Sequence, residues 1–294
     1  MWSRASKNVE QFLLSGLATG AIYALVAVGF VVIYNVTGII NFAQGEFAMC
    51  GAMTAAALVA AAVPLPLALL AGVALSALVG LVAWYAALRG AANSSIVVQI
   101  IITIGLSIAL RGVALLVFGS SPKSLPAFGH GSALLLGAAT LAPQQLWVFG
   151  IVIVLMGLLW LLFERTRLGS ALLAAAMDRP AARLMGIDPL AMGAFAFVLS
   201  ATLAGIAGVA IAPITLATYN MGLALGLKGF VAAILGGISS IPGAVIGGLL
   251  LGVVESVGSG LLPSGSKDAI AFVVLIAVLF ARPEGILGHR AQRV

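Results

Sequence analysis

The feature that most constrains this chain is a single carboxylate inside a long uncharged stretch. Between Gln11 and Leu88, Glu46 is the only charged residue. A helix needs about 20 apolar residues to cross a bilayer, and this stretch is long enough for several such helices. A carboxylate at membrane depth is costly and usually faces protein or a water-filled path. The sequence therefore predicts several membrane-spanning helices around a buried polar site.

The composition supports lipid as the solvent for most of the chain. Of the 294 residues, 63% are hydrophobic and 7% are charged, whereas a soluble domain carries about 25% charged residues. Because no polar stretch is long enough for a second globular unit, we expect a single transmembrane domain over residues 1–294. The N-terminus lacks a short apolar run that ends in a small-residue cleavage site, so the first span is expected to remain in place.

Several function classes are disfavoured by what the sequence lacks. The net charge of +6 fits Lys and Arg retained in cytoplasmic loops better than a nucleic-acid-binding face. Cys50 is the only cysteine and the two histidines are far apart, so we expect no disulfide, no metal site and no cofactor. The sequence has no glycine-rich phosphate loop followed by Lys-Ser or Lys-Thr, which predicts that the chain does not bind ATP itself. Nor does any nucleophile–base pair suggest an enzyme.

The apolar runs predict an all-α, polytopic transmembrane helix bundle with about eight or nine spans, some of them broken or re-entrant. The longest run exceeds one simple helix and holds Gly236, Gly237 and Pro242 near its middle. Proline suits the first turn of a helix and breaks an interior. We therefore expect a short piece that ends near Gly237 and a helix from Pro242 onward. The runs are 12–34, 42–62, 65–87, 96–118, 146–163, 193–217, 229–260 and 268–281.

The distribution of Lys and Arg predicts the orientation of the chain. Segment 164–192 and the tail 282–294 are rich in arginine and are expected in the cytoplasm, whereas loop 119–145 is expected outside. Counting back through the spans places the N-terminus outside, although Arg4 and Lys7 favour the opposite side. If both ends are cytoplasmic, one early segment must be re-entrant.

The first polar interruption of the apolar runs holds the isolated carboxylate. Asn41 is a good helix N-cap, and Gln44 stands in the capping-box position three residues later. Glu46 then falls in the first turn or two of the helix, where the helix dipole favours its negative charge. One interpretation is the polar lining of a path through the membrane. The other is an interfacial loop in which Glu46 is a satisfied cap or the partner of an arginine.

A second polar pattern occurs in the run 96–118. Gln99, Thr103 and Ser107 repeat every four residues and predict one polar stripe on a helix, which faces either a path or a neighbouring helix. Arg111 of the same run is expected to snorkel outward rather than to pair with an acid. Further along the chain, Glu255 is a second carboxylate in an apolar run, and Lys228 is expected near an external turn.

The segment 164–192 predicts two short helices rather than a disordered linker. Ser170 is expected to cap the first helix, and Arg179 to leave it because a residue before proline avoids the helical region. Pro180 then starts the second helix, which Gly186 can stop. The result would be a rigid cytoplasmic knob.

The charges of this segment suggest what such a knob does. Asp178, Arg179, Arg183 and Asp188 mix both signs, whereas a helix that lies on lipid headgroups is more uniformly basic. We therefore favour a docking element for a cytosolic partner over a helix pair on the membrane surface.

Five segments carry a family resemblance, namely Gly16–Leu25, Asn41–Phe47, Arg165–Asp188, Lys267–Phe272 and Arg282–Gly288. In these segments, and over nearly its full length, the sequence resembles the inner-membrane permeases of branched-chain amino acid ABC importers, in their shorter form. The permease motif that begins Glu-Ala-Ala in many ABC importers reads Ala174-Ala175-Ala176 here, so Asp178 and Gly186 carry that alignment by position. Close relatives of this family also move urea, short amides and other small polar solutes.

The resemblance implies a set of partners and roles. It implies import of branched-chain or other small amino acids across the bacterial inner membrane, with a second, non-identical permease, two cytosolic ATPases and an extracytoplasmic solute-binding protein. A self-contained secondary transporter or channel that uses Glu46 and Glu255 is the alternative, and a membrane-embedded enzyme ranks last. The expected substrate path includes Asn41, Gln44, Glu46, Gln99 and Thr103, and the expected ATPase coupling residues are Ser170, Asp178, Arg179, Arg183 and Gly186.

Overall fold

The computed structural model describes residues 2–92, 94–129, 132–136, 139–261, 267–282 and 284–288. Both histidines, His130 and His289, lie outside these residues, as do Arg290 and Arg293 of the tail and the side chains of Arg4 and Lys7. The described elements are α1 (Trp2–Thr37), α2 (Gln44–Ala60), α3 (Leu65–Ala83), the π-helical turn η1 (Trp84–Leu88), α4 (Ile96–Phe118), β1 (Leu134–Leu136), β2 (Ala139–Leu141), α5 (Pro143–Arg165), α6 (Arg167–Met177), α7 (Arg179–Leu184), α8 (Pro189–Thr215), α9 (Met221–Gly236), α10 (Ile241–Leu261) and α11 (Lys267–Ala281).

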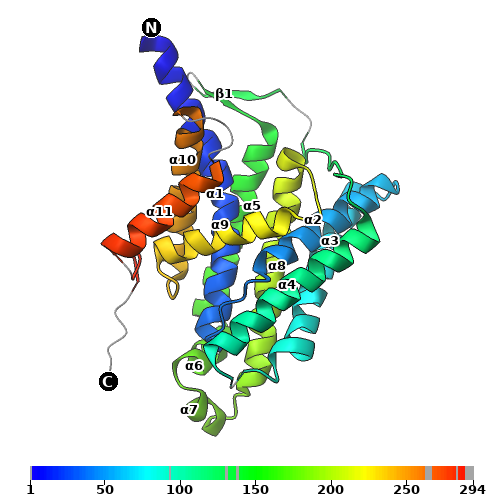
Figure 1. Cartoon of the computed structure of the whole chain (residues 1–294), viewed down its shortest axis with the longest axis vertical. Coiled ribbons are helices and arrows are strands. Elements are labelled where there is room, and N and C mark those ends of the chain that lie inside the picture. Colours follow the sequence, from blue (N-terminus) through cyan, green and yellow to red (C-terminus); the bar gives the residue numbers. More distant parts are fainter. Residues whose placement is uncertain are drawn as a thin grey trace.

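The expected all-α membrane bundle is confirmed (Figure 1). Within the described residues, six helices are long and apolar enough to cross a bilayer, namely α1, α3 with η1, α4, α5, α8 and α10. α2, α9 and α11 are shorter. The only described strands, β1 and β2, pair as one small antiparallel hairpin. The predicted break in the run 229–260 is also found, because α9 ends at Gly236 and α10 begins at Ile241 after Gly237, whose φ is +110°.

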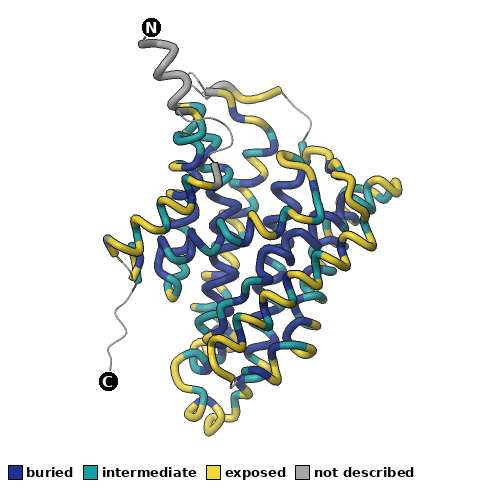
Figure 2. Tube along the Cα trace, viewed as in Figure 1, coloured by how far each residue is buried: buried dark blue, intermediate teal, exposed yellow. Residues whose placement is uncertain are grey.

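Two helices, α1 and α8, form the centre of the bundle. Their membrane-spanning parts are mostly buried by other helices, whereas most residues of α3, α4 and α5 are only partly buried or exposed (Figure 2). The exposed residues of the outer helices are largely leucine, isoleucine and valine, which is the surface that lipid or another membrane subunit covers. The fold is therefore an inner pair of helices wrapped by apolar outer ones.

Small residues allow α1 and α10 to touch backbone to backbone. A Cβ added at Gly252 would lie 2.4 Å from the Cα of Gly20, and one added at Gly248 would lie 2.5 Å from the Cα of Ala24. Apolar side chains gain little by leaving lipid for another helix, so close packing of this kind supplies much of the stability of a membrane bundle. The contact explains the glycine content of these two helices.

We expect Gly252→Ala to destabilise the protein by about 1–3 kcal/mol, the usual cost of overpacking. The added methyl group would meet backbone atoms of Gly16 and Gly20, which cannot move aside without separating the helices. Gly157→Ala in α5 is the matched control, because nothing lies within 4 Å of a Cβ at that position. Thermal unfolding in detergent measures both. Equal melting temperatures for the two variants would contradict the predicted close contact.

The two ends of the molecule carry different elements. The Gln11 side chain of α1 exchanges hydrogen bonds with the backbone of Thr140 in β2, at 3.1 and 2.8 Å. α6 and α7 lie at the opposite end of the bundle (Figure 1). The start of α1 and the loop 119–145 thus share one end, as the orientation predicted from Lys and Arg requires.

Candidate functional site: a charged centre between α2, α4 and α9

The break between α1 and α2 forms one side of the site. Gly38 follows the last residue of α1 and has a φ of +71°. The side-chain oxygen of Asn41 accepts a hydrogen bond from the Ala43 N–H at 3.1 Å. α2 begins at Gln44 with Ala43 in the cap position, so the predicted Asn41–Gln44 capping box is wrong. The Gln44 amide instead accepts from the Ser200 hydroxyl at 2.8 Å and donates to the Ser200 carbonyl at 3.3 Å. A partner on α8 has replaced the local cap.

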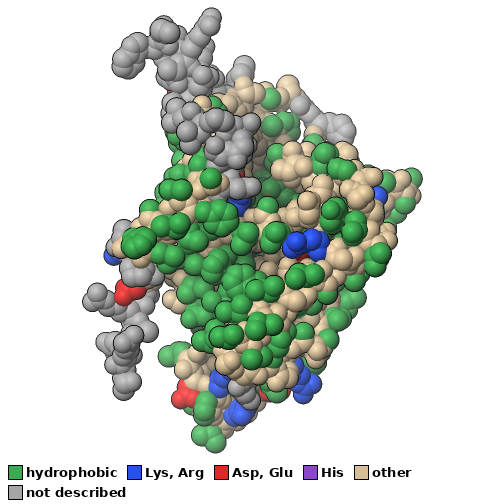
Figure 3. Space-filling model, viewed as in Figure 1, with side chains coloured by type: hydrophobic (Ala, Val, Ile, Leu, Met, Phe, Trp, Pro, Cys, Tyr) green, Lys and Arg blue, Asp and Glu red, His purple; other side chains and the backbone are tan. Residues whose placement is uncertain are grey.

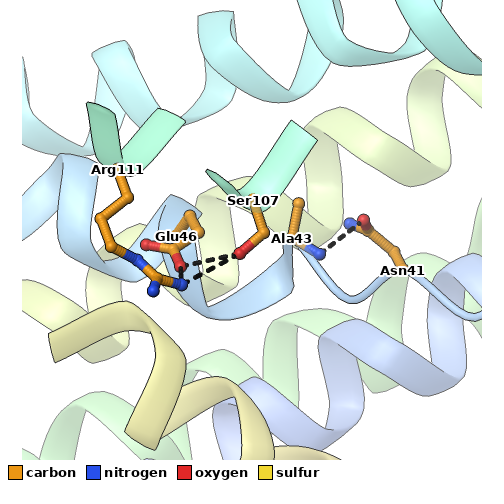
Figure 4. A network of polar contacts seen from close by, with 5 residues as sticks. All are labelled: Asn41, Ala43, Glu46, Ser107 and Arg111. Carbon is orange, nitrogen blue, oxygen red and sulfur yellow. Dashed lines mark hydrogen bonds and ion pairs between the residues drawn. The ribbon is translucent and has the colours of Figure 1, made fainter. Parts of the chain in front are cut away.

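Glu46 lies in the first turn of α2, as expected, and is only 1% exposed. One carboxylate oxygen accepts from the Ser107 hydroxyl at 2.9 Å and from the Arg111 guanidinium at 2.7 Å (Figure 4). The other oxygen makes no hydrogen bond to a described residue and faces the backbone of Gly222 at the start of α9. We call Glu46, Ser107 and Arg111 the charged centre. Glu46 is thus both deeply buried and paired with an arginine.

The predicted outward snorkelling of Arg111 is wrong. Its side chain turns inward to Glu46 and is 25% exposed. A buried carboxylate within reach is the physical reason, because an ion pair gains far more energy in a low-dielectric interior than at a hydrated surface. The Arg111 Nε nevertheless makes no hydrogen bond to a described residue.

The polar stripe of α4 faces protein, and its members have different tasks. The Thr103 hydroxyl contacts the Ile40 carbonyl in the α1–α2 break at 3.4 Å, and Ser107 joins the charged centre. Gln99 is turned away from it. Its amide donates to backbone carbonyls of the loop before α4, including that of Ala91 at 3.2 Å. Thr103 therefore lies beside the α1–α2 break that holds Asn41 and leads to Glu46. Gln99 instead holds the loop before α4.

A second buried ion pair joins α9 to α10. The Lys228 ammonium lies 2.7 Å from one Glu255 oxygen, and the Tyr23 hydroxyl donates to the other at 2.9 Å. Lys228 sits in the middle of α9 rather than near an external turn, so that expectation is wrong. The available signal was that Lys228 is the only charged residue in an otherwise apolar helix. Sequence analysis also gave no indication of the part played by Tyr23.

Two cavities lie beside α9 and share Arg111, Leu223 and Leu227 as lining residues. The first, of about 340 Å³, is also lined by Phe30 and Ser107. The second, of about 400 Å³, also includes Lys228 of α9 and Phe272 of α11. On this face of the molecule, basic side chains stand among hydrophobic ones (Figure 3). The site therefore offers charged groups next to apolar walls.

The α6–α7 segment forms the knob predicted from the sequence, with different caps. Thr166 caps α6, because its hydroxyl oxygen accepts from the Gly169 N–H at 3.0 Å. Ser170 lies one turn further on and donates to the Thr166 carbonyl at 3.3 Å, so its predicted role as the cap is wrong. The threonine at the end of α5 reaches the free N–H groups first.

The second helix of the knob begins one residue earlier than predicted. Asp178 leaves the helical region and caps α7 by accepting from the Ala181 N–H at 3.0 Å, whereas Arg179 is already helical. Gly186 follows the end of α7 with a φ of +80°, as expected. Arg183 is exposed. Large apolar residues are exposed beside these charges, with Met177 at 87%, Leu184 at 89% and Met185 at 81%.

Arg179 connects the knob to the end of α1. Its guanidinium donates to the carbonyl of Thr37, with a longer contact of 3.5 Å to that of Val36. These carbonyls belong to the last turn of α1, where a cation is favoured by the helix dipole. Eight residues lie between Thr37 and Glu46 along the chain. A short path of hydrogen bonds and backbone thus runs from α7 to the buried carboxylate.

The fold and the site define a multi-spanning helical membrane protein with ion pairs buried among its helices. Residues 12–279 match the family described as the permease component of the branched-chain amino acid transport system. The chain belongs to this family.

Individual relatives agree with that assignment. The chain is 37% identical to the high-affinity branched-chain amino acid transport system permease protein BraD of Pseudomonas aeruginosa, with 95% of each protein covered. It is 33% identical to the corresponding permease LivH of Escherichia coli, with 95% of this chain and 97% of LivH covered. The ribose import permease RbsC of Escherichia coli is 29% identical over 91% of this chain and 84% of its own length. PsaBC of Streptococcus pneumoniae, solved in complex with Fab, shares the fold with a TM-score of 0.54 at 16% identity and 97% coverage of both chains.

Proposed function

We propose that this chain is a membrane-spanning permease subunit of an ATP-driven importer for branched-chain or other small amino acids in the bacterial inner membrane. Its partners would be a second, non-identical permease, two cytosolic ATPases and an extracytoplasmic solute-binding protein. The observation that carries the proposal is the α6–α7 segment, a structured knob at one end of the bundle whose arginine is bonded to the end of α1. Membership of the permease family supports the same conclusion.

The surface of the knob suits a protein partner. Exposed Met177, Leu184 and Met185 lie next to Asp178 and Arg183. Apolar side chains ringed by charges are typical of protein interfaces rather than of free surfaces. We propose that the ATPases dock on this surface, with Ser170 and Gly186 setting the shape of its two helices.

Coupling would run from the knob into the membrane through α1. When the ATPases bind ATP and move the knob, Arg179 would carry the motion to Thr37 and the α1–α2 break. The break leads directly to Glu46. A shift of the break from one position to another would therefore rearrange the charged centre. The ATPases must bind the two states with different affinities, because only a differential affinity can drive the change.

The substrate path is proposed along the charged centre, between this chain and the second permease. Ser107 and Arg111 would line it, with Glu46 and Thr103 buried behind them. Asn41 and Gln44 would hold the break in shape. Gln99 would act indirectly, by fixing the loop before α4.

A secondary transporter is less well supported. Glu46 and Glu255 are each paired with a cation in the described structure, whereas ion coupling needs a carboxylate that can take up and release an ion.

A substitution series at Asp178 tests the docking surface. Asp178→Lys removes the cap of α7, at a cost of about 0.5–2 kcal/mol, and reverses the charge next to the exposed apolar residues. We expect this variant to lose the ATPases on purification and to lose uptake in proteoliposomes. Asp178→Asn keeps a good capping side chain and is the matched control. It should retain most of the bound ATPases and most of the uptake.

The outcomes separate the two parts of the proposal. If the wild-type chain, co-expressed with its candidate partners, neither retains ATPases nor supports ATP-dependent uptake of amino acids, the importer assignment fails. If uptake is present and Asp178→Lys does not reduce it, the importer stands and the docking surface has been placed wrongly.

A further inference from the structure

We infer that the cavity between α4, α9 and α11 is a binding site for the carboxylate group of the transported solute. The inference rests on the proposed transport function and specifies the chemistry of the solute. The cavity has a volume of about 400 Å³, which lies within the range of about 300–1,000 Å³ of small-molecule sites. Two cations from different helices, Arg111 and Lys228, line it.

The charges are arranged so that the positive groups face the cavity and the negative groups lie behind them. The side chains of Arg111 and Lys228 are 25% and 15% exposed, whereas those of their partners Glu46 and Glu255 are 1% and 8% exposed. Neither carboxylate lines the cavity. The buried acids thus hold the cations in place and offset the cost of keeping them in the membrane, while an incoming molecule meets a positive wall.

Arg111 lines the cavity and retains N–H donors for a carboxylate. Its Nη2 already donates to Glu46 and Ser107 and its Nε is buried, whereas its Nη1 makes no hydrogen bond to a described residue. A guanidinium offers five donors in a planar fork, and carboxylates accept such pairs of N–H groups readily. The hydrogen bonds already made fix the plane of the guanidinium before a ligand arrives.

Apart from Asn220, the remaining wall is apolar. Leu227 and Val231 of α9 face Phe272 of α11 across the cavity. An aliphatic side chain of a few carbons can leave water against these residues, whereas a charged side chain cannot do so without losing its hydration. The site therefore fits a carboxylate that carries a short aliphatic body, and it offers no comparable gain to urea or a short amide.

Site-directed labelling tests this inference on the assembled transporter. Cys50 is the only native cysteine and is buried, so Leu223→Cys in a Cys50→Ala background places one reactive thiol at the cavity. Leu134→Cys in the same background is the control, because Leu134 in β1 is exposed and does not line the cavity. The rate of modification by a methanethiosulfonate reagent is measured with leucine, 4-methylpentanoate, isoamylamine or urea.

We expect the two carboxylates to slow labelling about tenfold when present at about ten times their dissociation constants, as mass action requires. Isoamylamine and urea should leave the rate unchanged, as should every solute at the control position. In the neutral pair Glu46→Gln with Arg111→Met, the carboxylates should no longer slow labelling. This double variant avoids a lone buried charge, so that it remains folded.

Other results would overturn the site. If isoamylamine slows labelling as much as leucine does, the cavity recognises the aliphatic body and not the carboxylate. If the transporter takes up leucine but no solute slows labelling, the transport function stands and the cavity is not its binding site. If carboxylates slow labelling but no ATP-dependent uptake occurs, the binding site stands and the importer assignment fails.

Discussion

Arg111→Met should destabilise the protein by about 3–5 kcal/mol, the usual cost of removing one partner from a buried ion pair, and should abolish uptake. Glu46 is 1% exposed, and one of its oxygens accepts from both Arg111 and Ser107. Without the guanidinium, a carboxylate would remain in the membrane interior with only a serine hydroxyl to stabilise it. Thermal unfolding in detergent and uptake in proteoliposomes measure the two effects.

The neutral pair Glu46→Gln with Arg111→Met provides the matched control. A glutamine can still accept from Ser107, and a methionine can cover the apolar part of the space that Arg111 fills. Replacing both members of a buried ion pair is often neutral or stabilising, so this variant should melt close to the wild type while uptake stays lost. A double variant that melts as low as Arg111→Met would show that the arginine stabilises the fold through contacts other than Glu46.

Features that depend on neighbouring residues in the chain were predictable from the sequence. The break between α9 and α10 follows from Gly236, Gly237 and Pro242, whose conformational preferences act locally. The two short helices of the knob follow in the same way from Pro180 and from Gly186, whose φ is +80°. Local signals of this kind fixed the presence of these elements to within a few residues.

Features that depend on distant residues were not predictable. Gln44 was assigned to a capping box because only its local neighbours could be considered, whereas Ser200, 156 residues away, is its partner. Arg111 and Glu46 are 65 residues apart, and without the depth of each helix their pairing could not be chosen over snorkelling. The sequence nevertheless contained a signal for both ion pairs. Lone charges in apolar runs, of both signs, should first be tested as partners of one another, and that rule would also have paired Lys228 with Glu255.

The bond between Arg179 and the end of α1 is where the proposed coupling is most open to test. We expect Arg179→Ala to fold, to keep its ATPases and to hydrolyse ATP, but to lower solute uptake by about 5–150-fold, which corresponds to a typical coupling free energy of about 1–3 kcal/mol. The guanidinium is the described link from α7 to the Thr37 carbonyl, and alanine removes it without touching the exposed face of the knob. The measurement is the number of solute molecules imported for each ATP hydrolysed.

Arg183→Ala is the matched control for this substitution. Arg183 lies on the same short helix and is exposed, so its loss should weaken ATPase binding without changing the ratio of import to hydrolysis. If Arg179→Ala instead releases the ATPases, Arg179 belongs to the docking surface. If import and hydrolysis stay coupled in this variant, motion reaches the charged centre by another route. The packing of α6 and α7 against α8 would then be the next contact to break, because α8 carries Ser200, whose hydroxyl holds Gln44 at the start of α2.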